Sequence, residues 1–276
     1  MEANIIHCGE CAEVMRDNIP DNAIDLTVTS PPYDNLREYQ GYEWDFVTVA
    51  NELWRITKPG GVVVWVVADA TINGSETGTS FRQALYFMSL GFNLHQTVIY
   101  EKSGRLPTQD RYYNVIEYMF VISKGKPNAL NFLVDHVNAS QGQKRTKDKV
   151  INKGRPQKKD TKTQYRARKH SRRSNVWKYH VGNNGNDLTI HPAIFPEALP
   201  RDHIISWSNP GDVVLDPFVG SGTTAKMAIL TGRRYIGIDI SEEYCQLARE
   251  RVAKVEAQPM LIPFEAEKSE QSTMFD

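Results

Sequence analysis

Two strand-forming runs separated by an amphipathic segment constrain the fold of this 276-residue chain more than any other feature. Residues 24–29 are rich in apolar and β-branched side chains, and residues 62–68 are entirely apolar, which predicts two buried strands. Between them, residues 46–57 carry apolar side chains at helical spacing and end at Lys58-Pro59-Gly60-Gly61, which predicts a helix followed by a turn at Gly60 and Gly61. Strand, helix and strand in this order are typical of a parallel sheet covered on both faces.

The same alternation continues along the chain. Further strands are expected at residues 94–100, 117–123, 213–215 and 235–238, and further helices at residues 80–90, 223–230 and 241–255. Strands 94–100 and 117–123 are candidates for an antiparallel edge pair. Ser241 is the expected N-cap of the last helix. The prediction is therefore an α/β fold with a mostly parallel sheet and helices on both faces.

Charge is unevenly distributed, although the formal net charge is zero. Ser140–Asn175 contains fourteen Lys or Arg residues and only two acids, a local charge of +12. The remainder holds 19 of the 33 basic and 31 of the 33 acidic residues, a charge of −12. A basic insert in an acidic body indicates a polyanionic partner, and its near lack of apolar residues suggests that it becomes ordered on that partner. The alternative is a solvated basic loop.

Composition excludes several other classes. No apolar run approaches the length that spans a bilayer, and no basic-then-apolar signal begins the chain, so we expect a cytoplasmic protein with no membrane partner. Three cysteines cannot form a disulfide framework. Cys8 and Cys11 form a C-x-x-C pattern, but no second pair completes a tetrahedral site, so we expect no metal and read them as two small packed side chains.

A glycine turn lies between the expected strand at 213–215 and the helix that follows it. Asp216-Pro-Phe-Val-Gly220-Ser-Gly222 allows backbone N–H groups and a helix N-terminus to approach a ligand closely. Gly220-x-Gly222-x-x-Ala225 also fits a loose dinucleotide fingerprint, and Asp239 follows the next strand where an acid would accept bonds from ribose. On this pattern alone NAD binding, another nucleotide cofactor and a merely tight turn remain open.

The flanking residues favour one of these. The run Asp216-Pro-Phe-Val-Gly-Ser-Gly-Thr-Thr closely resembles the S-adenosylmethionine motif of DNA amino-methyltransferases, and Ser30-Pro31-Pro32-Tyr33, after the first strand, resembles their catalytic motif. The catalytic motif precedes the basic insert and the cofactor motif follows it, an order that resembles the circularly permuted β class. The resemblance covers about residues 5–255 and implies a Rossmann-like methyltransferase fold.

The resemblance also assigns roles to individual residues. It places the cofactor S-adenosylmethionine against the glycine turn and its neighbours, and an acid after a glycine near the N-terminus against the adenine. The implied cofactor-binding residues are Glu10, His191, Pro192, Phe195, Asp216, Phe218, Gly220, Ser221, Gly222, Thr223 and Asp239. Many family members have Asp where this chain has Glu10.

The chemistry of an amino group explains the catalytic motif. Its nitrogen is a poor nucleophile because the lone pair is delocalised into the base, and two acceptors aimed at its protons oppose that delocalisation and stabilise the developing charge. The Ser30 hydroxyl and the Pro31 carbonyl would be these acceptors, with Pro32 fixing the carbonyl and Tyr33 stacking on a flipped-out base. Without the family, the same residues describe a proline turn after a strand.

The first residue of that motif bears on the substrate. Family members with Ser there usually methylate cytosine N4, and those with Asp usually methylate adenine N6. Cytosine N4 is therefore expected, with adenine N6 as the alternative. A catalytically silent nucleic-acid-binding module and an NAD oxidoreductase are the competing functions of other classes.

We thus expect a methyltransferase domain over residues 1–257, interrupted at residues 138–175 by a DNA-binding, target-recognising insert, and a flexible tail over residues 258–276. DNA is the expected partner, and the sequence leaves open a homodimer and a cognate restriction endonuclease that acts separately. The expected DNA-binding residues are Lys144, Arg145, Lys147, Arg155, Lys158, Lys159, Arg166, Arg168, Arg172 and Arg173.

Affinity for DNA should fall steeply as the salt concentration rises, because Lys and Arg contacts to phosphates release counterions. Measuring the DNA dissociation constant between about 50 and 200 mM salt checks this, with an expected loss of about 10³-fold or more if six or more phosphates are neutralised. A nearly flat plot of log K against log salt would remove the insert from the interface.

Overall fold

The computed structural model describes residues 1–32, 44–103, 110–139, 141–147, 163–166, 168–179 and 195–257, with the backbone alone at 144–147 and 163–166. These residues form two compact units. One combines Met1–Asn131 with the chain from Asn175 onward, and the other is Phe132–Ser174, where the sequence predicted an insert at 138–175.

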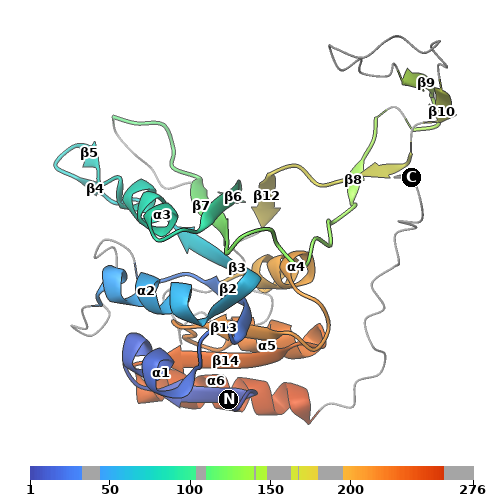
Figure 1. Ribbon diagram of the computed structural model, residues 1–276. Helices are drawn as coiled ribbons and strands as arrows, with labels where there is room; N and C mark the ends of the chain where they lie inside the picture. Colours follow the sequence, from blue (N-terminus) through green and yellow to red (C-terminus); the bar gives the residue numbers. More distant parts are fainter. Residues whose placement is uncertain are drawn as a thin grey trace. The chain divides into compact units, whose positions relative to one another are not determined.

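An eight-stranded sheet forms the centre of the larger unit, as traced in the described residues (Figure 1). Its spatial order is β1 (Ile5–Cys8), β14 (Arg234–Asp239), β13 (Val213–Asp216), β2 (Ile24–Thr29), β3 (Thr57–Val67), β7 (Ile116–Ser123), β6 (Asn93–Lys102) and β12 (Val176–Tyr179). Only β7 runs antiparallel to its neighbours, so the carboxyl ends of the other strands of this sheet lie at the same edge.

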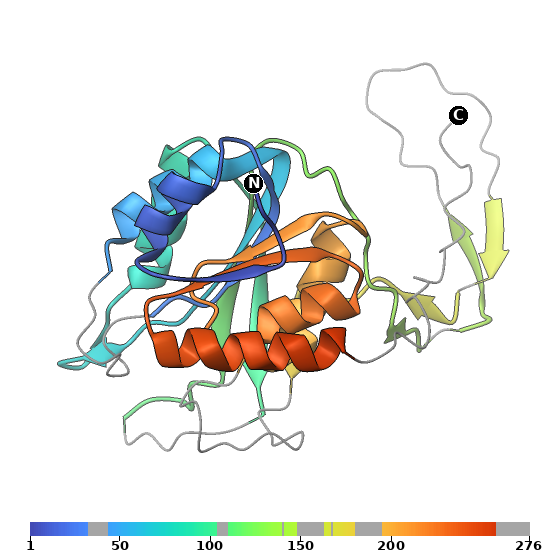
Figure 2. The same ribbon diagram turned by 90° about the horizontal axis from the view of Figure 1, so that it is seen from below.

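Helices cover both faces of this sheet (Figure 2). On one face lie α1 (Cys11–Asn18), α2 (Phe46–Ile56) and α3 (Thr79–Ser89), and on the other lie α4 (Ala198–Trp207), α5 (Thr223–Leu230) and α6 (Glu242–Glu256). The connections between parallel strands are right-handed, so the direction in which the chain moves across the sheet decides which face the connecting helix covers. The chain moves from β2 to β3 in one direction and from β13 to β14 in the opposite direction, so α2 and α5 lie on opposite faces. The predicted α/β layering is confirmed.

The point at which the strand order changes direction, the switch point of the sheet, lies between β13 and β2. These strands are parallel neighbours, with Val214 opposite Leu26 and Leu215 opposite Thr27. The helices that follow them, α5 after β13 and α2 after β2, lie on opposite faces of the sheet, and in open α/β sheets such a switch point is where ligands bind. The cofactor-like motif of the sequence begins at the end of β13, and the catalytic-like motif begins directly after β2.

Most predicted elements agree with the structure, and the last helix begins after its predicted N-cap, Ser241, whose hydroxyl accepts from the Tyr244 N–H. Two expectations need correction. Strands 94–100 and 117–123 do pair antiparallel, but β12 extends the sheet beyond β6, so they are not the edge.

Gly60 and Gly61 do not make a free turn. β3 begins at Thr57, and its register with β2 shifts so that Ile24 faces Thr57 while Leu26 faces Val62. Gly60 has φ +81° and its N–H donates to the Lys124 carbonyl over 2.6 Å, so the glycines form a bulge within the sheet.

Short paired segments complete the structure. In the larger unit, β4 (Thr71–Ile72) pairs with β5 (Ser75–Glu76). In the smaller unit, β8 (His136–Val137) pairs with β11 (His170–Ser171), and β9 (Lys144–Lys147) pairs with β10 (Thr163–Arg166), both antiparallel. No helix in the described ranges combines the length and apolar character needed to cross a membrane.

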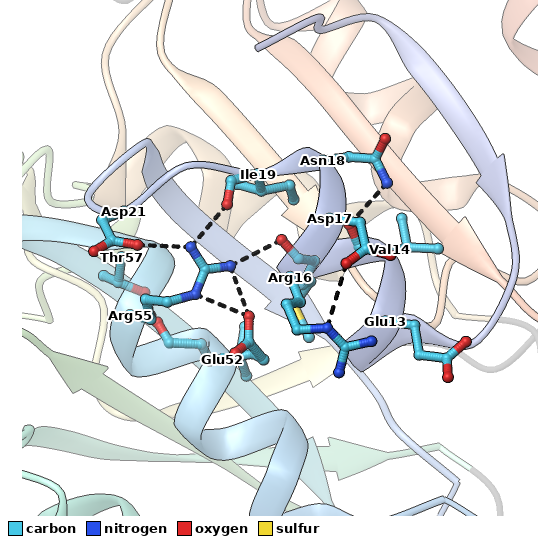
Figure 3. A network of polar contacts seen from close by, with 12 residues as sticks. Glu13, Val14, Arg16, Asp17, Asn18, Ile19, Asp21, Glu52, Arg55 and Thr57 are labelled. Atoms are coloured by element: carbon cyan, nitrogen blue, oxygen red, sulfur yellow. Dashed lines mark hydrogen bonds and ion pairs between the residues drawn. The ribbon is translucent and has the colours of Figure 1, made fainter.

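Arg55 joins the end of α1 to α2 (Figure 3). Its guanidinium donates to the Met15 and Ile19 carbonyls, both at 2.9 Å, and to the Glu52 and Asp21 carboxylates at 2.6 and 2.7 Å. The Met15 carbonyl also accepts from the Ile19 N–H over 3.1 Å, so Arg55 adds a charged donor to a carbonyl of the last turn of α1 and to the carbonyl of its C-cap residue, Ile19.

Replacing Arg55 by Ala should lower the free energy of unfolding by about 1–3 kcal/mol, because partly buried carbonyls and Glu52 lose their charged donor. Arg16→Ala is the matched control: Arg16 pairs with Asp17 while its side chain is 56% exposed, and its loss should cost about 0.5 kcal/mol or less. Urea denaturation measures both. Equal effects would show that the Arg55 network adds nothing beyond a surface ion pair.

Candidate active site

Ser30, Pro31 and Pro32 leave the carboxyl end of β2 at the switch point of the sheet. Ser30 is half-buried, and within the described ranges no group forms a hydrogen bond with its hydroxyl. The Pro32 carbonyl accepts from the indole N–H of Trp44 over 3.1 Å. Tyr33 lies outside the described residues, so its predicted stacking role stays a prediction.

A buried hydrogen bond connects the two motifs. Thr29, the last residue of β2, donates from its hydroxyl to Asp216 Oδ1 over 2.7 Å. The same oxygen accepts from the Phe218 N–H over 3.1 Å. Both Thr29 and Asp216 are buried, and burial raises the pKa of Asp216 to about 6 although these two bonds favour its charged form. No pattern in the sequence indicated that Thr29 takes part.

The glycine turn after Asp216 is held by the next strand. The Gly220 N–H donates to Asp239 Oδ2 over 2.9 Å, and the Ser241 N–H donates to Asp239 Oδ1 over 3.0 Å. Gly222 has φ +83°, and a Cβ there would lie 3.0 Å from Ala248 of α6. The turn therefore requires glycine both for its conformation and for the close approach of α5 to α6.

Glu10 lies at the same edge of the sheet. It follows β1, whose last residue Cys8 is paired with Asp239, and the Gly9 N–H donates to the Asp239 carbonyl over 2.9 Å. The Glu10 carboxylate caps α1 by accepting from the Glu13 N–H over 2.8 Å. Its position agrees with the predicted site, while its role towards a cofactor remains a prediction.

Arg251 on α6 is a residue of this turn that the sequence analysis missed. One guanidinium nitrogen donates to the Ser221 carbonyl at 3.1 Å, the Ser221 hydroxyl at 3.0 Å and the Thr223 hydroxyl at 2.9 Å. The hydroxyls of two predicted cofactor residues thus face α6. An arginine within an amphipathic helix carries no sequence signal for this contact.

The structure describes some, but not all, of the other predicted cofactor residues. Phe218 is half-buried, and its ring lies 5.1 Å from Trp44. Phe195 is half-buried and lies three residues before the start of α4, whose N-cap residue, Glu197, forms an ion pair with Lys226 of α5 at 2.6 Å. His191 and Pro192 lie outside the described residues.

The predicted DNA-binding residues fall in the smaller unit. Arg168 and Arg172 are exposed, Arg172 lies over the Phe132 ring, and Arg173 forms an ion pair with Asp135, which lowers the pKa of that carboxyl. The backbone of the β9–β10 ribbon carries Lys144, Arg145, Lys147 and Arg166. Arg155, Lys158 and Lys159 lie outside the described residues.

The C-x-x-C pattern is not a pair of packed thiols. Cys11, the first residue of α1, is buried and donates to the Glu10 carboxylate, whereas Cys8, the last residue of β1, is exposed. Among the described residues, no group of three or more His, Cys, Asp or Glu is arranged to hold a metal ion.

A mostly parallel sheet of this strand order, with a glycine turn at its switch point and an acid after the next strand, defines a Rossmann-like methyltransferase fold. A model of the DNA methylase family matches residues 24–250. The chain therefore belongs to the DNA methylase family, which sets aside the NAD oxidoreductase alternative.

Relatives agree with this assignment. The chain is 54% identical over 243 residues to an orphan methyltransferase, M.BamHII of Bacillus amyloliquefaciens, covering 86% of this chain and 92% of the relative. It is 29% identical over 262 residues to the DNA adenine methyltransferase YhdJ of Escherichia coli, covering 90% and 82%.

Solved structures are also similar. A DNA modification methylase from Thermus thermophilus, in a complex with S-adenosyl-L-methionine, is 26% identical with a TM-score of 0.60, covering 91% of this chain and 95% of the other. The PvuII cytosine-N4-specific DNA methyltransferase has a TM-score of 0.65 at 21% identity, covering 93% and 91%, which supports the fold.

Asp216→Asn should change the pH dependence of stability. The folded state holds the Asp216 proton more tightly than the unfolded chain, because the pKa of Asp216 is about 6 when folded and about 3.9 for an ordinary aspartate. Through this group the wild-type free energy of unfolding falls as the pH rises from about 4 to 6. The variant lacks this titration.

The stability of Asp216→Asn relative to wild type should therefore rise by about 2–3 kcal/mol between pH 4 and 7. Urea denaturation across this range measures it, with Asp17→Asn, which removes an exposed carboxylate, as the control for net charge. A constant difference between Asp216→Asn and wild type would contradict the raised pKa.

Proposed function

We propose that this DNA methyltransferase transfers a methyl group to the exocyclic N4 of cytosine in DNA, at a specific site and with the target base flipped out of the helix. The observation that carries the proposal is the position of Ser30. Its half-buried hydroxyl follows Thr29, which is hydrogen bonded to the first residue of the cofactor motif, Asp216.

The cofactor is S-adenosylmethionine, and the residues at the switch point fit it. Asp216 is a buried carboxylate whose pKa is raised by desolvation, so an approaching ammonium group would stabilise its charged form. The turn leads into α5 at its N-cap, Gly222, so the backbone N–H groups of a helix N-terminus lie beside this turn, as in other nucleotide-cofactor sites. Asp239 and Glu10 border the same edge, suited to the ribose and adenine parts.

Bound S-adenosylmethionine supplies an electrophilic methyl group, and the chain has to present the base nitrogen to it. The Ser30 hydroxyl and the Pro31 carbonyl would accept hydrogen bonds from the two amino protons, which directs the nitrogen lone pair towards the methyl group. Such acceptors also stabilise the positive charge that develops on the nitrogen as the sulfonium is converted to a neutral thioether. The loss of one of the two amino protons to solvent then leaves a neutral methylated amine. Tyr33 would stack on the base and recover part of the cost of flipping.

The choice of cytosine rests on Ser30 in the first position of the catalytic motif. The alternative is adenine N6, and the relative named as a DNA adenine methyltransferase, at 29% identity, favours it. Both amino groups make the same demand for two acceptors, so the proposed mechanism holds for either base.

We further propose that the enzyme acts without a cognate endonuclease, since the 54% identical relative is named an orphan methyltransferase. The predicted role of residues 138–175 in recognising DNA, a homodimer and a cytoplasmic location remain part of this proposal. Methylome sequencing of a host that expresses the gene would report the modified base and its sequence context together.

Ser30→Ala should reduce the rate of methyl transfer by about 10²- to 10³-fold, the usual effect of removing one hydrogen-bonding group aimed at a developing charge. Ser89→Ala, which removes an exposed hydroxyl on α3, is the control and should leave the rate unchanged. Labelled cofactor, unmethylated DNA and digestion to nucleosides measure the rate and identify the base.

The same digests test the substrate. N4-methylcytosine is the expected product, and N6-methyladenine alone would overturn the choice of base while leaving the mechanism in place. Methyl transfer retained in a Ser30→Ala, Tyr33→Ala double variant would overturn the mechanism itself.

A further inference from the structure

Trp44 contacts both halves of the candidate active site. Its indole N–H donates to the Pro32 carbonyl over 3.1 Å, joining two residues that are twelve positions apart in the chain. Its ring meets the Phe218 ring edge-on, with the centroids 5.1 Å apart. Pro32 belongs to the catalytic motif and Phe218 to the cofactor motif, and no sequence pattern pointed to Trp44.

The loop needs a contact of this kind because two successive prolines cannot donate hydrogen bonds from their backbone. The proline rings fix φ at Pro31 and Pro32, so ψ of Pro32 is the backbone torsion left free between the two carbonyls. A donor held against the Pro32 carbonyl fixes that torsion. It thereby sets the direction of the Pro31 carbonyl, which the proposed mechanism aims at the base.

Trp44 is itself firmly held. Its ring centroid lies 6.1 Å from those of Phe46 and Trp65 as well as 5.1 Å from that of Phe218, and Trp65 is fully buried. Phe46 and Trp65 in turn pack on Phe87 at 5.4 and 5.2 Å. Aromatic edge contacts of this kind have a preferred geometry, so the indole N–H points from a rigid cluster.

We propose that Trp44 is a positioning residue for methyl transfer: its indole N–H orients the catalytic loop, and its ring sets the place of that loop relative to Phe218 and the cofactor. The inference deepens the proposed function and rests on it. It also explains which carbonyl acts, because the Pro32 carbonyl is already occupied by Trp44 and the Pro31 carbonyl is the one left to receive the base.

Trp44→Phe keeps an aromatic ring and removes the N–H. The single-turnover rate of methyl transfer, measured with labelled cofactor and unmethylated DNA, should fall by about 10- to 100-fold, the effect of a misplaced reacting geometry. The dissociation constants for S-adenosylmethionine and DNA, and Tm, should stay near the wild-type values. Trp44→Ala also removes the contact with Phe218 and should in addition weaken cofactor binding, measured by calorimetry.

Trp54→Phe is the matched control. Trp54 is a second tryptophan that packs edge-on against a phenylalanine, Phe92, at 4.8 Å, and its replacement should leave the transfer rate unchanged. A Trp44→Phe variant with the wild-type rate would overturn the inference, as would a loss of rate matched by equal losses in Tm and cofactor affinity. If the wild-type protein transfers no methyl group to DNA, the proposed function fails, and this inference fails with it.

Discussion

The hydrogen bond between Thr29 and Asp216 is the contact on which the candidate site depends. It joins the ends of two parallel strands that lie side by side in space but are separated by 187 positions in the chain. Because both groups are buried, each would bear a desolvation cost without the other. The bond holds the start of the catalytic-like motif against the start of the cofactor-like motif, so that the two motifs proposed to hold the base and the methyl donor lie at one edge of the sheet.

Around this bond, four predicted cofactor residues, Gly220, Ser221, Thr223 and Asp239, are hydrogen bonded to side chains or backbone of neighbouring segments. Asp239 receives the N–H groups of Gly220 and Ser241, and Arg251 holds Ser221 and Thr223 from α6. Some of the hydrogen-bonding groups that the sequence analysis expected to contact the cofactor, the Asp239 carboxylate and the Ser221 and Thr223 hydroxyls, thus also bond to the protein. The protein's own contacts therefore hold the turn in shape, and a turn held in this way loses less conformational entropy when it binds a ligand.

Much of the fold could be predicted from the pattern of apolar residues and helix-capping residues in the sequence. Continuous apolar strands predicted a parallel sheet, and the N-cap Ser241 and the glycines after helices placed boundaries within a residue or two. The prediction was wrong about the sheet edge and about Gly60 and Gly61, for one shared reason. The short strand β12 and the bulge in β3 are stabilised by pairing with distant segments, β6 and Lys124, which local propensity does not register.

The sequence by itself determined the class of this protein, because two specific motifs and their order around a basic insert identify the DNA amino-methyltransferase chemistry and its expected cofactor. It also named the residues proposed to contact the base and the cofactor, such as Ser30 and Asp216. Only the tertiary structure revealed Thr29, Arg251 and Trp44, whose side chains act on residues far away in the chain. The chemistry of methyl transfer restricts which residue types can contact the base and the cofactor, and this restriction is visible in the sequence. A supporting contact needs only a hydrogen-bond donor at the right point in space, and the folded chain decides where that point lies.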